Sequence, residues 1–290
     1  MTRTIGLLYD PHIVEGDRDG YDGVPTVEAA IDKLNDLSVD WTVLGGDLRH
    51  LLGAANQYNF DRTDWGGWHG DPDNYFYHRD FERAKTIFDE RLESDYFVAR
   101  GNNDRPLDVY REYFPADEFP QWGWFTEDEA RYVILDTNPH LGYHSLRDQQ
   151  NFVSAPQISM LERLMDDDAE IPTFVFLHAP VAKHEGIDSW DTGPNAAYSL
   201  TLNYPTVQRV LERGNTVFVN SGHYWRDTGR NVEEVNGVQY VLARHLVHNR
   251  DPDYGGDVRW MRVNTNERTA SVHYYDVGAD EEGMLTRAEW

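Results

Sequence analysis

The sequence predicts a layered α/β protein, and two regularities carry that prediction. Short apolar runs rich in β-branched and aromatic residues alternate with amphipathic stretches, and the helical patterns stop after Gly237. Such alternation is typical of sheets covered by helices, and the closing run of strands favours antiparallel pairing. At 290 residues, with 40% hydrophobic and 13% aromatic residues, the chain can also bury a sizeable core.

Nine segments have the composition of buried strands. They are residues 5–9, 41–44, 96–99, 132–135, 173–177, 216–220, 238–243, 258–263 and 270–275. Four stretches between them carry apolar residues at helical spacing. These predicted helices begin at Pro25, at about Arg79, at Ser154 and at Tyr204.

The sequence predicts a single domain over residues 1–276. A long loop at about residues 51–78 interrupts it, and an acidic tail at residues 277–290 follows it. The loop is rich in Gly, Asp, Asn and aromatic residues such as Tyr77, which either form a lid over a substrate or pin the loop to the domain. The tail is expected to fray, although Trp290 offers an apolar anchor.

The charge of the chain is strongly one-sided. It has 51 acidic against 26 basic residues, a formal net charge of −25, and its lysines are Lys33, Lys85 and Lys183. We expect a halophilic protein, since a Debye length of about 3 Å at about 1 M salt screens this self-repulsion; an ordinary acidic protein is the alternative. A nucleic-acid partner is not expected, because the chain has no broad basic face to displace counterions from phosphates.

The lengths of the apolar segments indicate where in the cell the protein is located. None approaches the roughly 20 residues that span a bilayer, and the first apolar run, at residues 5–9, lacks the length and cleavage site of a secretory signal. We therefore expect a cytoplasmic protein with no membrane partner. The chain contains no cysteine, so any metal must be held by His, Asp, Glu or Asn.

Potential metal ligands directly follow five of the predicted strands. They stand in Asp10-Pro11-His12, in Gly45-Gly46-Asp47, in Gly101-Asn102-Asn103-Asp104, at His178, and in Ser221-Gly222-His223. Each residue alone has an ordinary explanation as a cap, a turn or a buried histidine. Together they would meet in the crevice at the carboxyl ends of the strands, with the ligand chemistry of a dinuclear Mn, Fe, Zn or Ni centre.

In order and spacing, these motifs resemble those of the calcineurin-like metallophosphoesterases, which run DxH, GD, GNHD, a lone His after a strand, and GHxH. The resemblance covers about residues 4–243. It implies a four-layer α/β/β/α sandwich with two divalent metal ions at the sheet edge. It also implies a ligand assignment: Asp10 and His12 for the first metal, Asn102, His178 and His223 for the second, and Asp47 bridging them.

Two positions depart from the family pattern. Trp225 stands where the last His of GHxH is expected, so the first site would be weak or empty unless His50 or His245 replaces the missing ligand. Asn103 stands in place of the GNHD histidine; it can donate a hydrogen bond but is no general acid near neutral pH. Asn103 and Asp104 remain the candidate catalytic residues.

The resemblance implies a metal-dependent phosphoesterase in which a metal-bound hydroxide attacks a small phosphorylated substrate. Without a general acid, good leaving groups are favoured, which indicates a phosphodiester or a pyrophosphate-type nucleotide, with manganese among the expected metals. The alternative is a catalytically impaired member that serves as a metal- or ligand-binding module. A nuclease is disfavoured by the missing basic stripe.

Overall fold

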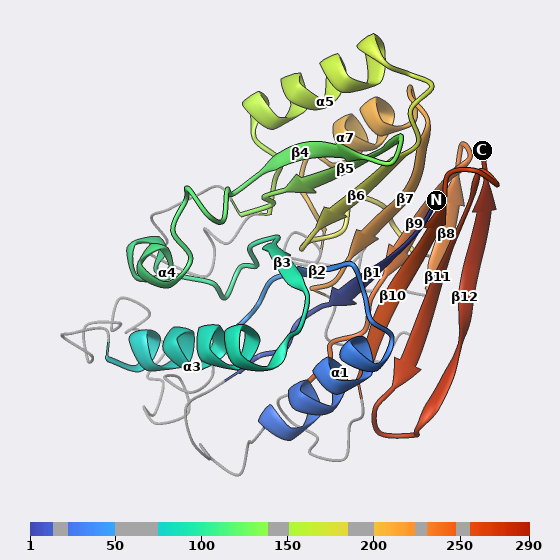
Figure 1. Ribbon diagram of the computed structural model, residues 1–290. Helices are drawn as coiled ribbons and strands as arrows, with labels where there is room; N and C mark the ends of the chain where they lie inside the picture. The colour runs from blue at the N-terminus through green and yellow to red at the C-terminus, as the bar shows by residue number, and fades with distance from the viewer. Residues whose placement is uncertain (14–22, 50–74, 139–150, 185–199, 224–230, 248–255) are drawn as a thin grey trace.

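The computed structural model describes residues 1–13, 23–49, 75–138, 151–184, 200–223, 231–247 and 256–290 (Figure 1). Within these ranges, two six-stranded sheets pack face to face, and helices cover the outer face of each. The predicted four-layer α/β/β/α sandwich is therefore confirmed.

The first sheet has the order β12-β11-β10-β1-β2-β3. Its three short strands run parallel to one another: β1 (Thr2–Leu8), β2 (Trp41–Leu44) and β3 (Asp95–Val98). Three longer strands extend it beyond β1 in antiparallel register: β10 (Asp257–Asn264), β11 (Thr269–Asp276) and β12 (Glu281–Glu289). The predicted antiparallel close of the chain is confirmed.

The second sheet has the order β4-β5-β6-β7-β9-β8. Its four inner strands are parallel: β5 (Ala130–Leu135), β6 (Thr173–Leu177), β7 (Thr216–Ser221) and β9 (Val238–Leu242). An antiparallel strand closes each edge, β4 (Gly123–Glu127) on one side and β8 (Val232–Val235) on the other.

Alternating side chains build the layers. In β6, Phe174 and Phe176 pack into the core between the sheets, while Val175 and Leu177 face the helices. Such a strand reads as an unbroken apolar run because both of its faces are buried. The helices α1 (Val24–Asp36) and α3 (Tyr75–Arg91) cover the first sheet, and α5 (Ala155–Asp167) and α7 (Tyr204–Leu211) cover the second.

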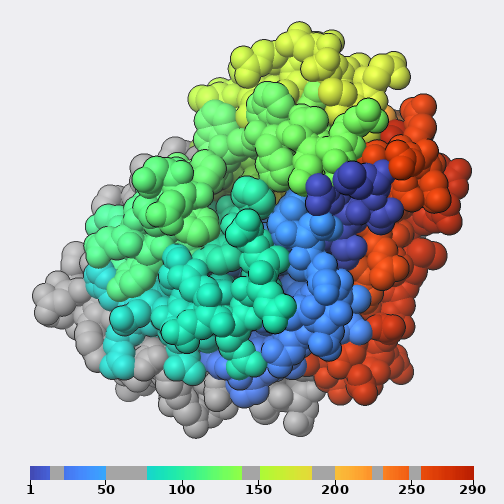
Figure 2. All heavy atoms as spheres, in the orientation of Figure 1, coloured from blue at the N-terminus to red at the C-terminus, as the bar shows by residue number. Residues whose placement is uncertain are grey.

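The prediction of a frayed tail is wrong for residues 281–290. They form β12, which pairs with β11 along its length, and Leu285 and Ala288 pack against the inter-sheet core. The Trp290 ring lies 5.8 Å from the Phe174 ring in an edge-to-face contact. Figure 2 shows the closing strands β10 to β12, in orange-red to dark red, as one flank of the molecule beside the N-terminal residues in dark blue. The segment is acidic, but its spaced apolar residues pack against the core while its backbone pairs as an edge strand.

Other elements differ from the prediction for local reasons. The edge strands β4 and β8 were not predicted, because their residues are half exposed or acidic, as Glu233 and Glu234 are. The short helix α4 (Leu107–Tyr113), which packs on α3, was also not predicted. Of the predicted loop at 51–78, residues 51–74 lie outside the described ranges, whereas the last four begin α3, where Tyr77 is buried over the Arg49 guanidinium. Among the described helices, none is long and apolar enough to cross a membrane.

Candidate metal centre

The loops after the parallel strands of both sheets meet at one edge of the sandwich. The loops after β1 and β2 lie side by side, since Asp10 N donates to Gly46 O at 3.2 Å and His12 N donates to Asp47 O at 3.0 Å. His178 directly follows β6 in the facing sheet, and its Nδ1 lies 2.9 Å from the Gly45 carbonyl oxygen. Residues far apart in the chain thus converge, as expected for the carboxyl ends of parallel strands.

The backbone is strained at this convergence. Asp10 (φ 52°), His12 (φ 45°), Asp47 (φ 52°) and His223 (φ 71°) all adopt the left-handed region, although none is glycine. That conformation costs about 1–2 kcal/mol for an ordinary L-residue, and such strain clusters where function requires it. All four residues are predicted metal ligands, so four of the ten described non-glycine residues with positive φ lie at the predicted site.

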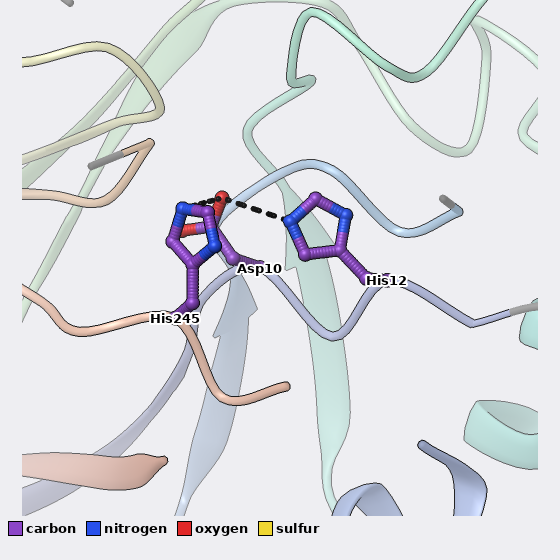
Figure 3. Close-up of side chains that lie close together, drawn as sticks. All are labelled: Asp10, His12 and His245. Atoms are coloured by element: carbon purple, nitrogen blue, oxygen red, sulfur yellow. Dashed lines mark ion pairs between the residues drawn. The ribbon is translucent and has the colours of Figure 1, made fainter. Parts of the chain in front are cut away.

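A first group of side chains consists of Asp10, His12 and His245, whose ligand atoms lie within 4.8 Å of one another (Figure 3). His245 Nε2 lies 3.3 Å from Asp10 Oδ1, and His12 Nε2 lies 3.9 Å from the same oxygen. All three residues are buried. One carboxylate and two imidazoles therefore face a common point.

The Asp10 carboxylate is held by one oxygen and offers the other. Its Oδ2 accepts a hydrogen bond from His223 N at 2.9 Å. Gly222 makes this approach possible, because a Cβ at position 222 would lie 2.4 Å from Oδ2. Asp10 Oδ1 is buried and has no hydrogen-bond partner within the described part of the chain. A buried carboxylate oxygen without a donor is costly unless a cation lies beside it.

A second group consists of Asp47, His178 and His223, again with ligand atoms within 4.8 Å of one another. His178 Nδ1 faces the Gly45 carbonyl, which can only accept, so Nδ1 carries the proton and Nε2 keeps its lone pair. His223 Nε2 accepts a hydrogen bond from Asn151 Nδ2 at 3.2 Å, so in the neutral ring Nδ1 carries the proton and faces His178 Nε2 at 3.0 Å. These hydrogen bonds orient both rings toward the centre of the group.

Two acceptor oxygens and the His223 ring surround His178 Nε2. Asn102 Oδ1 and His223 Nδ1 each lie 3.0 Å away, and Asp47 Oδ1 lies 3.4 Å away. Asn102 Oδ1 and Asp47 Oδ1 can only accept hydrogen bonds, and His178 Nε2 carries no proton to donate to them. A cation among these three atoms would relieve their mutual repulsion. The structure brings together all four residues predicted around the second metal, and their donors fit a divalent ion.

Asn103 and Asp104, the predicted catalytic residues, both support this arrangement. Asn103 donates from its backbone N to Asp47 Oδ1 and from Nδ2 to Asp47 Oδ2, each at 2.7 Å, and its Oδ1 accepts from Asn102 Nδ2 at 3.2 Å. Asp104 is fully buried and accepts from Leu48 N at 2.7 Å and Gly101 N at 2.8 Å. Asn103 therefore orients two predicted ligands, and Asp104 joins the loops that carry them.

Burial sets the protonation of the groups. It lowers the pKa of His12 and of His178 to about 4, so both rings are neutral near pH 7, the form that binds metals. Burial, and then the neighbouring Asp47 carboxylate, raises the pKa of Asp10 well above its ordinary value. Burial, and next Asp47, also raises the pKa of Asp104 to about 7. Burial and mutual repulsion thus oppose ionisation of these carboxyl groups, and a cation beside them would relieve both effects.

Two of the sequence predictions lie outside the described residues, namely the departure at Trp225 and the replacement ligand His50. The structure does place His245, the other replacement considered, beside Asp10 and His12. It also adds Asn151, which sequence reasoning missed. His245 carried the same signal as the motif ligands, since it closely follows the end of a strand, β9. Asn151 had no such signal, because it follows no predicted strand.

The sequence matches no family model and no curated protein. Solved structures match its fold. A dimetal phosphatase from Danio rerio aligns over 98% of both chains with a TM-score of 0.69 and 13% identity. The protein TT1561 of Thermus thermophilus aligns over 99% of this chain and 100% of its own, with a TM-score of 0.50 and 13% identity. The fold of this chain is that of the calcineurin-like metallophosphoesterases.

Proposed function

We propose that this protein is a metal-dependent phosphoesterase with two divalent ions. The observation that carries the proposal is the pair of adjoining groups at one sheet edge, one around Asp10 and one around His178. The two groups are directly linked, because His223 of the second donates its backbone N–H to Asp10 of the first. Ions bound there would neutralise phosphoryl oxygens and lower the pKa of an attacking water.

The residues of the chain have separate roles in this proposal. The imidazoles and carboxylates would hold the ions, and Asp47 of the second group would be a ligand of both. Asn103 keeps Asp47 and Asn102 in place through its amide. Because these contacts use the amide group, and because an amide has no acid function near neutral pH, Asn103 does not protonate a leaving oxygen.

The substrate class follows from this missing acid. We propose a pyrophosphate-type nucleotide or a phosphodiester with a good leaving group, because a phosphate or an aryl oxide departs without a proton from the enzyme more readily than an alkoxide does. We also propose that the protein works in concentrated salt, with manganese as one suitable metal. A phosphorylated anion would otherwise be repelled by a chain of net charge −25, whereas molar salt screens that field.

The test is hydrolysis of bis(p-nitrophenyl) phosphate in molar KCl, with Mn²⁺, Fe²⁺, Zn²⁺ or Ni²⁺ supplied in turn. We expect metal-dependent release of p-nitrophenol that Asp47→Ala abolishes. The monoester p-nitrophenyl phosphate and an alkyl monoester serve as comparison substrates, and the alkyl monoester should react most slowly. Turnover no faster than that of Asp47→Ala with every metal would rule out the enzyme and favour a metal-binding module of the same fold.

A further inference from the structure

We propose that His245 is a protein ligand of the first metal ion. It would replace the last histidine of the GHxH motif, where this chain has Trp225. This inference rests on the metal centre of the proposed function, but it concerns how one ion is held and not what reaction follows. Without it, the first ion would have Asp10, His12 and a shared Asp47. With His245, the first ion has two imidazoles, as the second ion has from His178 and His223.

The path of the chain carries His245 to the site. β9 belongs to the second sheet and β10 to the first, so the segment between them passes from one sheet to the other. At its start, Ala243 N donates to Ser221 O at 2.7 Å, next to the end of β7. Just beyond His245, Leu246 N donates to Tyr9 O at 3.1 Å. His245 is therefore fastened between the two strand ends that precede His223 and Asp10.

The residue before β10 closely approaches the backbone of the same segment. A Cβ at Gly256 would lie 2.3 Å from His245 O and 2.1 Å from Leu246 O, which is closer than any side chain could come. Glycine at position 256 is thus what allows β10 to start directly against the backbone of His245. The ring is positioned by backbone contacts on both sides and not by a flexible loop.

The ring itself faces the first group. His245 Nε2 lies 3.3 Å from Asp10 Oδ1, and neither atom has a hydrogen-bond partner within the described part of the chain. Two buried polar atoms therefore face each other without a hydrogen bond between them, which is costly. A cation beside both atoms resolves this contact.

A simple ion pair between His245 and Asp10 is the competing explanation. Such a pair would form a short charge-assisted hydrogen bond, yet His245 Nε2 and Asp10 Oδ1 lie 3.3 Å apart and make no hydrogen bond within the described residues. His12 also shares the site, with its ring centroid 4.9 Å from that of His245. Imidazoles suit ions such as Zn²⁺, Fe²⁺ or Ni²⁺, and a carboxylate also suits Mn²⁺.

The test is Mn²⁺ binding to the full chain in molar KCl, followed by titration and by electron paramagnetic resonance. We expect the wild-type protein to bind two Mn²⁺ ions with the signal of an exchange-coupled pair. In His245→Ala, one ion should bind at least about 100-fold more weakly, and the signal should become that of isolated Mn²⁺, because a direct ligand is worth more than the 10–100-fold of an outer hydrogen-bond partner. His245→Glu, which restores a ligand oxygen, should recover the coupled pair.

His184→Ala is the matched control, because His184 is also buried, at 3% exposed, and belongs to neither group. It should bind two coupled ions like the wild type. Circular dichroism of the metal-free proteins checks that each variant folds, and the Glu variant keeps the test decisive if the Ala variant does not. A coupled pair in His245→Ala with unchanged affinity overturns the assignment, as does a wild-type protein that binds fewer than two ions. A coupled wild-type pair without phosphodiester turnover overturns only the proposed function.

Discussion

The two groups of the candidate centre differ in how the chain supplies them. Each member of the second group, Asp47, His178 and His223, stands in a motif directly after its strand. The first group takes only Asp10 and His12 from such a motif, and its third member, His245, comes from the connection that crosses between the sheets. A site built from strand ends can thus be completed by a residue that no local motif marks.

The groups also differ in how completely they are supported without a metal. In the second group, Asn103 donates to both oxygens of Asp47, and His178 is oriented by the Gly45 carbonyl. In the first group, Asp10 Oδ1 and His245 Nε2 have no hydrogen-bond partner within the described residues. The second group is therefore largely preorganised, whereas the first depends more on the ion that it would hold.

The largest effect is expected from Asp47→Asn, which tests whether the groups share a ligand. Removing this charge should weaken the binding of both Mn²⁺ ions. It should also lower kcat/KM for bis(p-nitrophenyl) phosphate at least about 1,000-fold, because metal charge stabilises the transition state by several kcal/mol. Titration of Mn²⁺ and steady-state kinetics measure the two quantities. If only one ion weakens, Asp47 belongs to the second group alone.

A smaller and more local effect is expected from Asn103→Ala. It removes the amide that donates to Asp47 Oδ2 and accepts from Asn102, so the affinity of the second ion should fall about 10–100-fold. The ion beside Asp10 should be affected less. Competition with a chelator, followed by metal analysis, separates the two affinities. Equal weakening of both ions would show that the supports of the two groups are not distinct.

The smallest effect concerns a histidine outside both groups. Burial, and next the Arg259 charge, lowers the pKa of His184 from 6.5 to about 4. The unfolded chain therefore binds a proton more readily than the folded chain, and stability present above pH 6.5 is lost as pH falls toward 4. Between pH 8 and pH 5 this loss is about 2 kcal/mol. Denaturant unfolding of metal-free His184→Gln should show a pH dependence weaker by that amount, and an unchanged pH dependence would contradict the shift.

Much of this architecture could be predicted from the sequence, for physical reasons visible in particular residues. Strands buried on both faces, such as β6, read as apolar runs, and the polar residues behind them mark the carboxyl edge of a parallel sheet. Edge elements such as β12 were harder to recognise, because its few spaced apolar residues stand among acidic residues such as Glu281 and Glu289, which obscure the strand pattern. His245 follows a strand end, as the motif ligands do, but its place beside Asp10 also depends on the crossing from β9 in one sheet to β10 in the other, which spacing alone does not encode.

The predicted role of Asn103 shows a second limit. From its place in the motif it is a candidate catalytic residue, and that role stays a prediction. The structure shows that its amide donates to Asp47 and accepts from Asn102. An asparagine can donate and accept at once, so the residue type alone does not reveal these contacts.

The most direct test of the metal centre is the anomalous diffraction of a crystal grown with Mn²⁺ in concentrated salt. Two anomalous peaks about 3.5–4 Å apart are expected. One should lie among Asp10, His12 and His245, and the other among Asp47, Asn102, His178 and His223. A single peak, or peaks away from these side chains, would contradict it.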